Sequence, residues 1–398
     1  MKPKLAILFE SSPFDRKGMF NAIHEKVKRL VADGTFQVEA FCIHSRDNSF
    51  TRRVRHTPEC EKVDSVTVEG VTYHILWYPF TITDHILTEI LSCKPLFFTR
   101  FLRHILPLFK SFDLVEAHST TAGCVACELK KEFGIPYVVT WHGSDIHTHP
   151  YKNSLVRKAT CNVIRSAEMN VYVSKALMLQ SRLLVDDAPS QVIFNGVSEH
   201  FFPLEAAKRE LLRRDFHIPL NTRVVAFVGN LHPVKNVLTL PRIFKNIKAA
   251  YSGNLLFWII GDGKLRRALE AELRNTAPDL PVVLWGNIPS PEMPRMMNCI
   301  DLLVLPSLNE GLPLVCCEAL RCGCNVVASD VGGVAEVVGK DFVTALSEDF
   351  AEKMAVLAAD TLRRRDGSSE IFQPLASCFD WNTSCKAELR LLKQVAEI

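Results

Sequence analysis

The chain has 398 residues, 47% of them hydrophobic, and a formal net charge of +3 at pH 7. This length and apolar content predict two domains, each able to bury its own core. The near-zero net charge argues against nucleic acid as a partner, because phosphate backbones are bound mainly by an excess of Lys and Arg.

Short apolar runs alternate with longer amphipathic stretches along the first half, a pattern typical of βα units with parallel strands. The first run ends at Glu10 and is too short for a signal peptide, so it predicts a buried strand. We expect strands at 5–10, 36–44, 71–77, 114–118, 137–141, 170–173 and 191–194, with helices at 17–32 and 121–133.

The segment 80–110 is rich in Phe, Leu and Ile, with basic residues interleaved. It is compatible with a basic amphipathic surface that contacts a membrane or a lipid-linked substrate. The more common arrangement is a pair of helices packed on the first sheet.

Two histidines follow predicted strands of the first half. His142 comes directly after the strand 137–141 and precedes Gly143. A histidine at a strand end can bind a sugar hydroxyl or transfer a proton, although a lone histidine is more often structural. His118 ends the strand 114–118 and resembles His142, with a weaker signal.

A charged stretch, 199–221, contains Pro203 and Pro219 and separates the halves. We therefore place the first domain at 1–200 and the second from 201. Each is expected to be a doubly wound α/β sheet, which binds ligands at the carboxyl ends of its strands. The second half predicts strands at 224–229, 255–261, 282–285, 302–306 and 325–329, and helices at 237–251, 263–275 and 313–322.

Three strand ends of the second half carry candidate binding groups. Lys235 follows the strand that ends at Gly229 and can meet a diphosphate as a point charge. The run Gly261-Asp262-Gly263 permits a tight turn and close backbone approach. Its glycines do not form the dinucleotide fingerprint, so a nicotinamide enzyme is not indicated. Asn287 lies in a loop that either presents backbone groups to a base or is a plain turn.

The run 310–319 is the most informative part of the sequence. Glu310 and Glu318 bracket a Gly, a Pro and an apolar run, after the strand 302–306. Pro313 suits the first turn of a helix, and a helix N-terminus attracts phosphate. Glu318 lies among apolar residues and would need a partner, such as a ribose hydroxyl. The pattern favours a nucleotide-sugar site over a buried salt bridge.

Two patterns are missing or incomplete. The sequence has no Asp-x-Asp motif, so no carboxylate pair is evident for a metal–diphosphate complex. Thirteen cysteines, an odd number, predict reduced thiols and a cytoplasmic chain. Cys124 and Cys127, like the group 316–324, fall in predicted helices without a matching set of histidines. Buried thiols are therefore favoured over zinc ligands.

Together these motifs resemble the family 4 retaining glycosyltransferases of the GT-B fold. Glu310 to Glu318 is the E-x7-E signature of that family, and 141–145, 195–197, 228–235 and 261–263 match its other blocks. The resemblance covers nearly all of the chain and is strongest over 224–339. It implies an α/β architecture of two Rossmann-like, doubly wound parallel-sheet domains facing a central cleft. The final helix, 381–398, would cross back to the N-terminal domain.

The resemblance implies a hexosyltransferase (EC 2.4) that moves a sugar from a nucleotide-diphosphate-sugar to an acceptor hydroxyl, in polysaccharide or glycolipid biosynthesis. The domain 201–380 would bind the donor, and 1–200 a carbohydrate or lipid-linked acceptor. The catalytic residues would be His142, Lys235 and Glu310. Donor binding would involve Asn230, Gly261, Asp262, Gly263, Asn287, Gly311, Leu312, Pro313, Leu314 and Glu318. The acceptor side would include Gly18, His118 and Asn195.

The chain departs from the family at two places. Asn230 stands where the family usually has an Arg, so Lys235 and the helix N-terminus hold the diphosphate alone, or Arg16 or Lys17 assists. The usual glycine-rich loop near the N-terminus is replaced by Ser11-Ser12-Pro13, with Gly18 remaining. We expect no cofactor, no metal and no nucleic acid, and a cytoplasmic protein, with peripheral contact at the inner membrane face through 80–110 left open.

Two alternatives share the same fold, since fold alone does not fix activity. One is a nucleotide-sugar epimerase or hydrolase. The other is a non-catalytic protein that binds sugar nucleotides. The presence of Glu310, Glu318, Lys235 and His142 favours the transferase.

Overall fold

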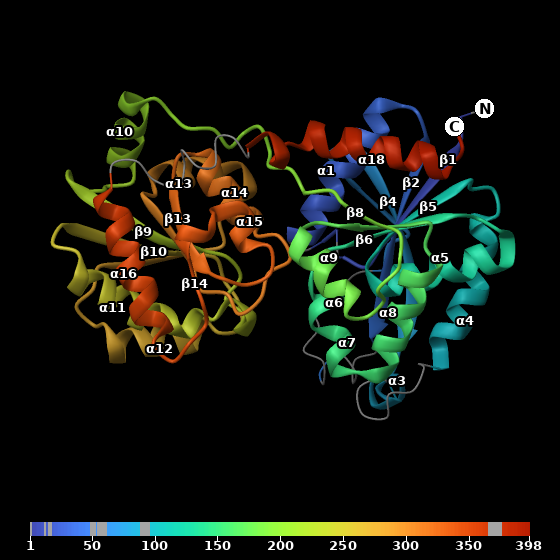
Figure 1. Ribbon diagram of the computed structural model, residues 1–398, viewed down its shortest axis with the longest axis horizontal. Helices are drawn as coiled ribbons and strands as arrows, with labels where there is room; N and C mark the ends of the chain where they lie inside the picture. The colour runs from blue at the N-terminus through green and yellow to red at the C-terminus, as the bar shows by residue number, and fades with distance from the viewer. Residues whose placement is uncertain are drawn as a thin grey trace. The chain divides into compact units, whose positions relative to one another are not determined.

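The alternating apolar runs form two parallel-sheet units in the computed structural model, which describes residues 2–11, 13–14, 18–47, 53, 62–87, 96–364 and 376–398. The first unit comprises Met1–Asn195 and Trp381–Ile398, and the second comprises Gly196–Asp380 (Figure 1). The division falls slightly before the predicted boundary. The final helix belongs to the first unit.

Within the described residues, the first unit has an eight-stranded sheet in the order β3-β4-β2-β1-β5-β6-β7-β8. The chain reverses its direction of winding between β1 and β5, the switch point of a doubly wound sheet. The strands are β1 (Lys4–Phe9), β2 (Gln37–Asp47), β3 (Ser65–Val68), β4 (Val71–Phe80), β5 (Leu114–His118), β6 (Tyr137–Trp141), β7 (Met169–Tyr172) and β8 (Ser190–Val192).

The sheet is parallel except for β3, an edge strand that the sequence did not predict. β3 pairs antiparallel with β4 through a two-residue turn at Glu69 and Gly70, which have φ of 46° and 82°. A turn with positive φ at both positions fits the twist of a hairpin. The strand has only four residues, and apolar and polar residues alternate weakly in it, so its sequence does not distinguish it from a loop.

Helices cover both faces of the first sheet. Alternate β1 side chains pack with α1 (Gly18–Asp33) and α18 (Trp381–Val395), which lie side by side (Figure 1). The opposite face is covered by α5 (Ser119–Phe133), against which α8 (Ser154–Ser166) packs. The remaining helical segments are α3 (Ile82–His85), α4 (Leu96–Ile105), η2 (Leu106–Phe109), α6 (Ser144–His147), α7 (His149–Lys152) and α9 (Lys175–Arg182).

The second unit has, in its described part, a six-stranded sheet in the order β11-β10-β9-β12-β13-β14, with every pair parallel. Its switch point lies between β9 and β12, and the predicted class of two parallel-sheet α/β domains is confirmed. The strands are β9 (Thr222–Val228), β10 (Asn254–Ile260), β11 (Val282–Gly286), β12 (Leu302–Leu305), β13 (Asn325–Ser329) and β14 (Val343–Thr344).

The helices of the second unit depart from expectation chiefly at 237–251. This stretch forms a 3-10 turn, η4 (Val237–Thr239), followed by α11 (Leu240–Ala250), because Pro241 lacks an N–H and suits the first turn of a helix. The others are α10 (Ala206–Asp215), η3 (Pro233–Lys235), α12 (Arg266–Thr276), η5 (Ser290–Glu292), α13 (Met293–Cys299), α14 (Leu314–Arg321), α15 (Val334–Val338), η6 (Lys340–Phe342), α16 (Phe350–Arg363) and η7 (Ala376–Phe379).

The basic apolar segment 80–110 lies partly outside the described residues. In its described part, α4 packs on β4, with Phe101 and Ile105 buried. Arg100 and Arg103 lie on the exposed side of α4. The apolar face of this helix therefore covers the sheet, and membrane contact stays a prediction.

No helix within the described ranges is both long and apolar enough to cross a membrane.

Asp301, just before β12, joins α10 to the amino edge of the second sheet. Its carboxylate lies 2.9 Å from Arg209 and 3.0 Å from Arg213, and accepts the Val224 N–H at 2.7 Å. Burial raises the pKa of Asp301, but the two guanidinium groups and the backbone donor outweigh burial, so the pKa is below its ordinary value. The carboxylate therefore stabilises this edge in its ionised form.

We predict that Asp301→Asn lowers the free energy of unfolding at pH 7 by about 3 kcal/mol, because it leaves Arg213 without its anion. Glu292→Gln, which removes an exposed ion pair with Arg295, is the control and should change it by about 0.5 kcal/mol or less. Since the folded pKa of Asp301 is lowered, its contribution is complete above its unfolded pKa and is lost as the pH falls through the folded value. Urea unfolding at several pH values measures both effects, and equal stability of the two variants would contradict the prediction.

Candidate functional site

The loops that follow β9, β10 and β11 meet at the carboxyl edge of the second sheet. Gly229 N–H donates to Ile260 O at 2.9 Å, and Gly261 N–H donates to Gly286 O at 2.7 Å. A Cβ on Gly261 would lie 2.1 Å from Gly229 O, and its φ is +125°. Gly261 is therefore required where predicted, because the neighbouring backbone occupies the space of a side chain.

An ion pair joins the loops after β9 and β12, the adjacent strands at the switch point. Lys235 Nζ lies 2.6 Å from Glu310 Oε1, and Ser307 Oγ donates to the same oxygen at 2.6 Å. The side chains of Lys235 and Glu310 are 23% and 10% exposed. The fold thus brings together two predicted catalytic residues and leaves both accessible to a ligand. Sequence reasoning missed Ser307, although it directly follows Pro306 in the strand-end motif.

The loop after β13 supports the loop that carries Glu310. A Cβ on Gly332 would lie 1.7 Å from Glu310 O, and Gly332 has φ of +52°. Gly333 N–H donates to Gly311 O at 3.2 Å, and Ser329 Oγ donates to Ser307 O. The sequence analysis did not select Gly332. The pattern that could have identified it is the pair Gly332-Gly333 between a predicted strand and the following helix.

The start of α14 differs slightly from the prediction. The helix begins at Leu314, and Pro313 precedes it as the capping residue rather than occupying the first turn. Leu314 N–H donates to Leu312 O at 3.0 Å. Of the four predicted donor-binding residues from Gly311 to Leu314, Gly311 and Leu312 therefore retain N–H groups without a partner in the described part of the chain.

Glu318 lies on α14 in apolar surroundings and is partly buried, as the sequence predicted. In the residues the structure describes, no donor pairs with its carboxylate. Burial raises the pKa of Glu318 to about 8. The group is therefore largely protonated at neutral pH, and incoming hydroxyl donors would favour its ionised form.

The corner between β9 and β10 holds the other predicted donor residues. Asn230 lies against Gly263, since a Cβ on Gly263 would be 2.4 Å from Asn230 Oδ1. Asp262 Oδ1 accepts the Gly263 N–H at 2.7 Å, and Asp262 Oδ2 lies 3.4 Å from Arg266 Nη1. Arg266, which the sequence analysis did not select, therefore places a positive charge next to Asp262.

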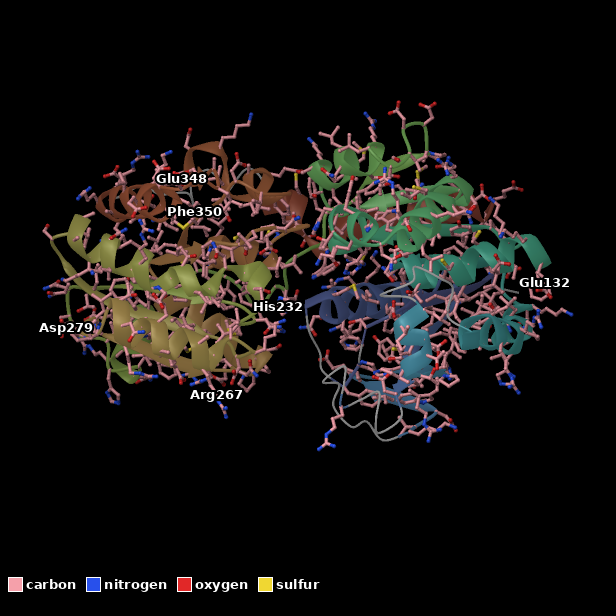
Figure 2. The ribbon with its side chains drawn as sticks, turned by 90° about the horizontal axis from the view of Figure 1, so that it is seen from below. Glu132, His232, Arg267, Asp279, Glu348 and Phe350 are labelled. Carbon is pink, nitrogen blue, oxygen red and sulfur yellow. The ribbon has the colours of Figure 1, made fainter. Side chains whose placement is uncertain are left out.

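One further predicted residue, Asn287, is not joined to the ion pair of Lys235 and Glu310. Asn287 is exposed after β11, next to Gly286. Arg16 and Lys17, the proposed substitutes for the missing Arg, lie outside the described residues. The loop of Lys235 follows strand β9, whereas Asp279 precedes strand β11. The two loops therefore lie at opposite edges of the sheet, and Figure 2 shows His232, of the Lys235 loop, and Asp279 at opposite ends of the second unit.

In the first unit, the ends of the adjacent strands β5 and β6 bring two predicted histidines together. His118 Nδ1 lies 3.0 Å from His142 Nε2. His118 is fully buried and His142 partly buried. Burial, assisted by the charge of Lys26, lowers the pKa of His142 to about 3. Both imidazoles are therefore neutral at pH 7, since burial also lowers the pKa of His118.

The loop after β6 holds His142 in place through Asp145. The carboxylate of Asp145 accepts the Gly143 N–H at 2.8 Å and the His142 N–H at 3.3 Å. Gly18, at the start of α1, is exposed, and Asn195 is buried at the end of the first unit's N-terminal segment. In the described part of the chain neither is hydrogen-bonded to the histidine pair.

The described cysteines are free thiols, most of them buried. In the ranges the structure describes, no three or more His, Cys, Asp or Glu side chains are grouped so as to hold a metal ion.

Comparison with known proteins gives consistent matches over both units. A model described as "Glycosyl transferase 4-like domain" matches 17–196, and one described as "Glycosyl transferases group 1" matches 222–360. The putative teichuronic acid biosynthesis glycosyltransferase TuaC of Bacillus subtilis (strain 168) is 26% identical over 280 residues, which are 69% of each chain.

Two further matches span most of the chain. The UDP-Gal:alpha-D-GlcNAc-diphosphoundecaprenol alpha-1,3-galactosyltransferase of Escherichia coli is 28% identical over 270 residues, 63% of this chain and 67% of its own. The crystal structure of Anabaena Alr3699/HepE in complex with UDP has a TM-score of 0.73 at 18% identity, covering 98% of this chain and 100% of its own.

We predict that Gly332→Ala displaces the loop of Glu310, because an added Cβ would overlap the Glu310 carbonyl. The matched control is Gly323→Ala, where φ is +77° and the nearest atom would be at an ordinary 3.8 Å. Both variants carry backbone strain of roughly 1 kcal/mol, and overlap should cost Gly332→Ala about 1–3 kcal/mol more. Urea unfolding compares them, and an equal loss of stability in both would show that the close approach is not limiting.

Proposed function

The chain belongs to the family 4 glycosyltransferases and has their GT-B fold, and from this premise we propose that it transfers a sugar with retention from a UDP-sugar to a hydroxyl of a carbohydrate or lipid-linked acceptor. Glycosyl transfer from a nucleotide-sugar in glycan biosynthesis, predicted from the sequence, is confirmed. The choice of uracil is supported by the UDP-Gal named for the E. coli relative and the UDP bound to HepE.

The observation that carries the proposal is the Lys235–Glu310 pair together with the carboxyl group of Glu318 on α14, which has no partner in the described residues. In the free chain each member of the pair neutralises the other. A diphosphate would take the place of Glu310 as the partner of Lys235. Glu310 would then be free to accept hydrogen bonds from the donor sugar, and Glu318 from the ribose.

This exchange of partners assigns Lys235 its main role in the transition state. Binding the ground-state diphosphate requires Lys235 to leave a 2.6 Å ion pair, so the net gain is small. As the bond to the leaving phosphate breaks, negative charge grows on the diphosphate and its attraction to Lys235 increases. Gly311 and Leu312 N–H groups would add to this stabilisation. The proposal therefore requires no metal ion.

The first unit would supply the acceptor side, where His142 would contact a substrate hydroxyl. Because the low pKa keeps His142 neutral, it would bind a hydroxyl rather than act as a cation. Retention would proceed with attack on the face from which the phosphate departs, the leaving phosphate accepting the proton of the acceptor.

We predict that Lys235→Ala lowers kcat at least about 100-fold and weakens UDP-sugar binding about tenfold or less. A radiolabelled transfer assay gives kcat, and calorimetry on the same sample gives the donor Kd. Lys245→Ala on α11 serves as the control for removing a lysine from this unit. If Lys235→Ala mainly weakened binding and left kcat unchanged, Lys235 would be a ground-state anchor.

We predict that UDP binding at pH 7 releases a proton from Glu318. The folded pKa of about 8 leaves the free carboxyl largely protonated, whereas bound ribose hydroxyls favour the carboxylate. Calorimetry in buffers of different ionisation enthalpy measures the released proton. Glu318→Gln should abolish the release and weaken binding by about 1–3 kcal/mol. Equal proton release in wild type and variant would remove Glu318 from this role.

A thermal-shift panel of UDP-, GDP- and ADP-sugars tests the donor class directly. A ligand that binds only the folded state raises Tm, by a free energy of about 2.7 kcal/mol at a concentration of 100 Kd. We expect the UDP-sugars to give the largest shift, equally with and without EDTA. A larger shift with another nucleotide would overturn the choice of base, and a shift that requires divalent metal would overturn the metal-free site.

A further inference from the structure

A buried polar cluster connects the last helix of the chain to His142. Lys26 on α1 lies 3.1 Å from Glu116 Oε1 on β5 and 2.6 Å from Glu388 Oε1 on α18. The three residues are 4%, 0% and 1% exposed. His118, at the end of β5, connects this cluster to His142. The proposed donor chemistry uses none of Lys26, Glu116 and Glu388.

The cluster contains two carboxyl groups and a single ammonium group among these three residues, so it holds one more negative than positive charge when both carboxyls are ionised. Glu116 Oε2 and Glu388 Oε2 have no hydrogen-bond donor in the described residues, and Glu388 Oε1 meets Lys26 as an ion pair without hydrogen-bond geometry. A proton held between the two carboxyls would give the cluster a net charge of zero and provide the missing donor. Burial and the neighbouring Glu116 raise the pKa of Glu388 well above its ordinary range, so Glu388 holds the proton and Glu116 the charge.

The ionised Glu116 determines which nitrogen of His118 carries hydrogen. Its Oε1 lies 3.1 Å from Lys26 Nζ, 3.4 Å from Thr140 Oγ1 and 3.3 Å from His118 Nε2. His118 Nε2 makes no hydrogen bond in the described residues, and Glu116 Oε1 is the charged atom that faces it. A carboxylate is only an acceptor, so the buried Nε2 lies favourably beside it only as N–H. In a neutral imidazole the other nitrogen, His118 Nδ1, then carries a lone pair.

That lone pair determines the tautomer of His142. His118 Nδ1 and His142 Nε2 are 3.0 Å apart, and one of the two must be the donor. Because His118 Nδ1 is the acceptor, His142 Nε2 carries the hydrogen. His142 Nδ1 is left as an acceptor, and in the described part of the chain it has no hydrogen-bond partner.

We propose that Lys26, Glu116, Glu388 and His118 are positioning residues that fix His142 in its Nε2-protonated tautomer, so that Nδ1 accepts a hydrogen bond from a substrate hydroxyl. This use of His142 rests on the proposed function. It specifies the substrate group as a hydroxyl that donates, which excludes a carbonyl, an ether or a phosphate oxygen at this point. The last helix contributes to the site through Glu388.

The test reads the tautomers by nuclear magnetic resonance of the full chain labelled with ¹⁵N-histidine. Long-range ¹H–¹⁵N spectra separate protonated from unprotonated ring nitrogens, and His142→Asn and His118→Asn assign the signals. We expect both histidines to carry hydrogen on Nε2 and none on Nδ1. Hydrogen on His142 Nδ1 in the wild type would overturn the proposal.

Substitutions of His118 separate positioning from simple packing. His118→Asn offers an amide oxygen near the position of Nδ1 and should preserve the His142 tautomer. His118→Leu fills the space without an acceptor and should give His142 a mixture of tautomers. It should also lower kcat/KM about 10–100-fold, with recovery in His118→Asn. His74→Asn, an exposed change on β4, is the control. A wild-type His142 spectrum in His118→Leu would overturn the proposal.

The two carboxyls provide a matched isosteric pair. Glu388→Gln resembles the protonated carboxyl and should leave Tm and the His142 spectrum close to those of the wild type. Glu116→Gln removes the charge beside Lys26 and should lower Tm clearly. The reverse order would overturn the assignment of the proton. These measurements use the ligand-free protein, so a confirmed tautomer without any shift in the donor panel would contradict the proposed function alone.

Discussion

The carboxyl edge of the second sheet depends on close approaches between backbone segments that leave no space for side chains. Gly261 faces the carbonyl of Gly229, and Gly332 faces the carbonyl of Glu310. Because the loops hold one another by main-chain contacts, the positions of Lys235 and Glu310 are fixed before any ligand arrives. Such preorganisation is what electrostatic stabilisation of a developing charge requires.

The two units use ion pairs in opposite ways. The Lys235–Glu310 pair is partly exposed, so water and an incoming anion can reach it, and its partners can be exchanged at modest free-energy cost. Lys26 is buried with its carboxyls, and separating that group would leave a charge without a partner in an apolar interior. Burial thus distinguishes a pair that binds ligand from a cluster that fixes the geometry of a histidine.

Candidate residues could be selected from the sequence where they directly follow a predicted strand. Lys235 and Glu310 were identifiable because parallel strands place their carboxyl ends at one edge. Gly332 and Arg266 were missed because their importance depends on which strands and helices are neighbours, which chain order does not reveal. In the sequence, Lys26 and Glu388 resemble the solvent-exposed charged residues that are usual on amphipathic helices. Their partnership depends on opposite ends of the chain meeting in one core.

The return of the last helix to the first unit has a consequence for the order of synthesis. Translation produces Lys26 and Glu116 early, completes every strand of the second unit next, and supplies Glu388 and the core residues Leu391 and Leu392 last. The second unit is contiguous and can close while the ribosome is still adding residues, as domains generally fold as units. The first unit, although begun first, finishes second. Until α18 emerges, the ammonium of Lys26 has Glu116 but not yet the second carboxyl that completes its environment.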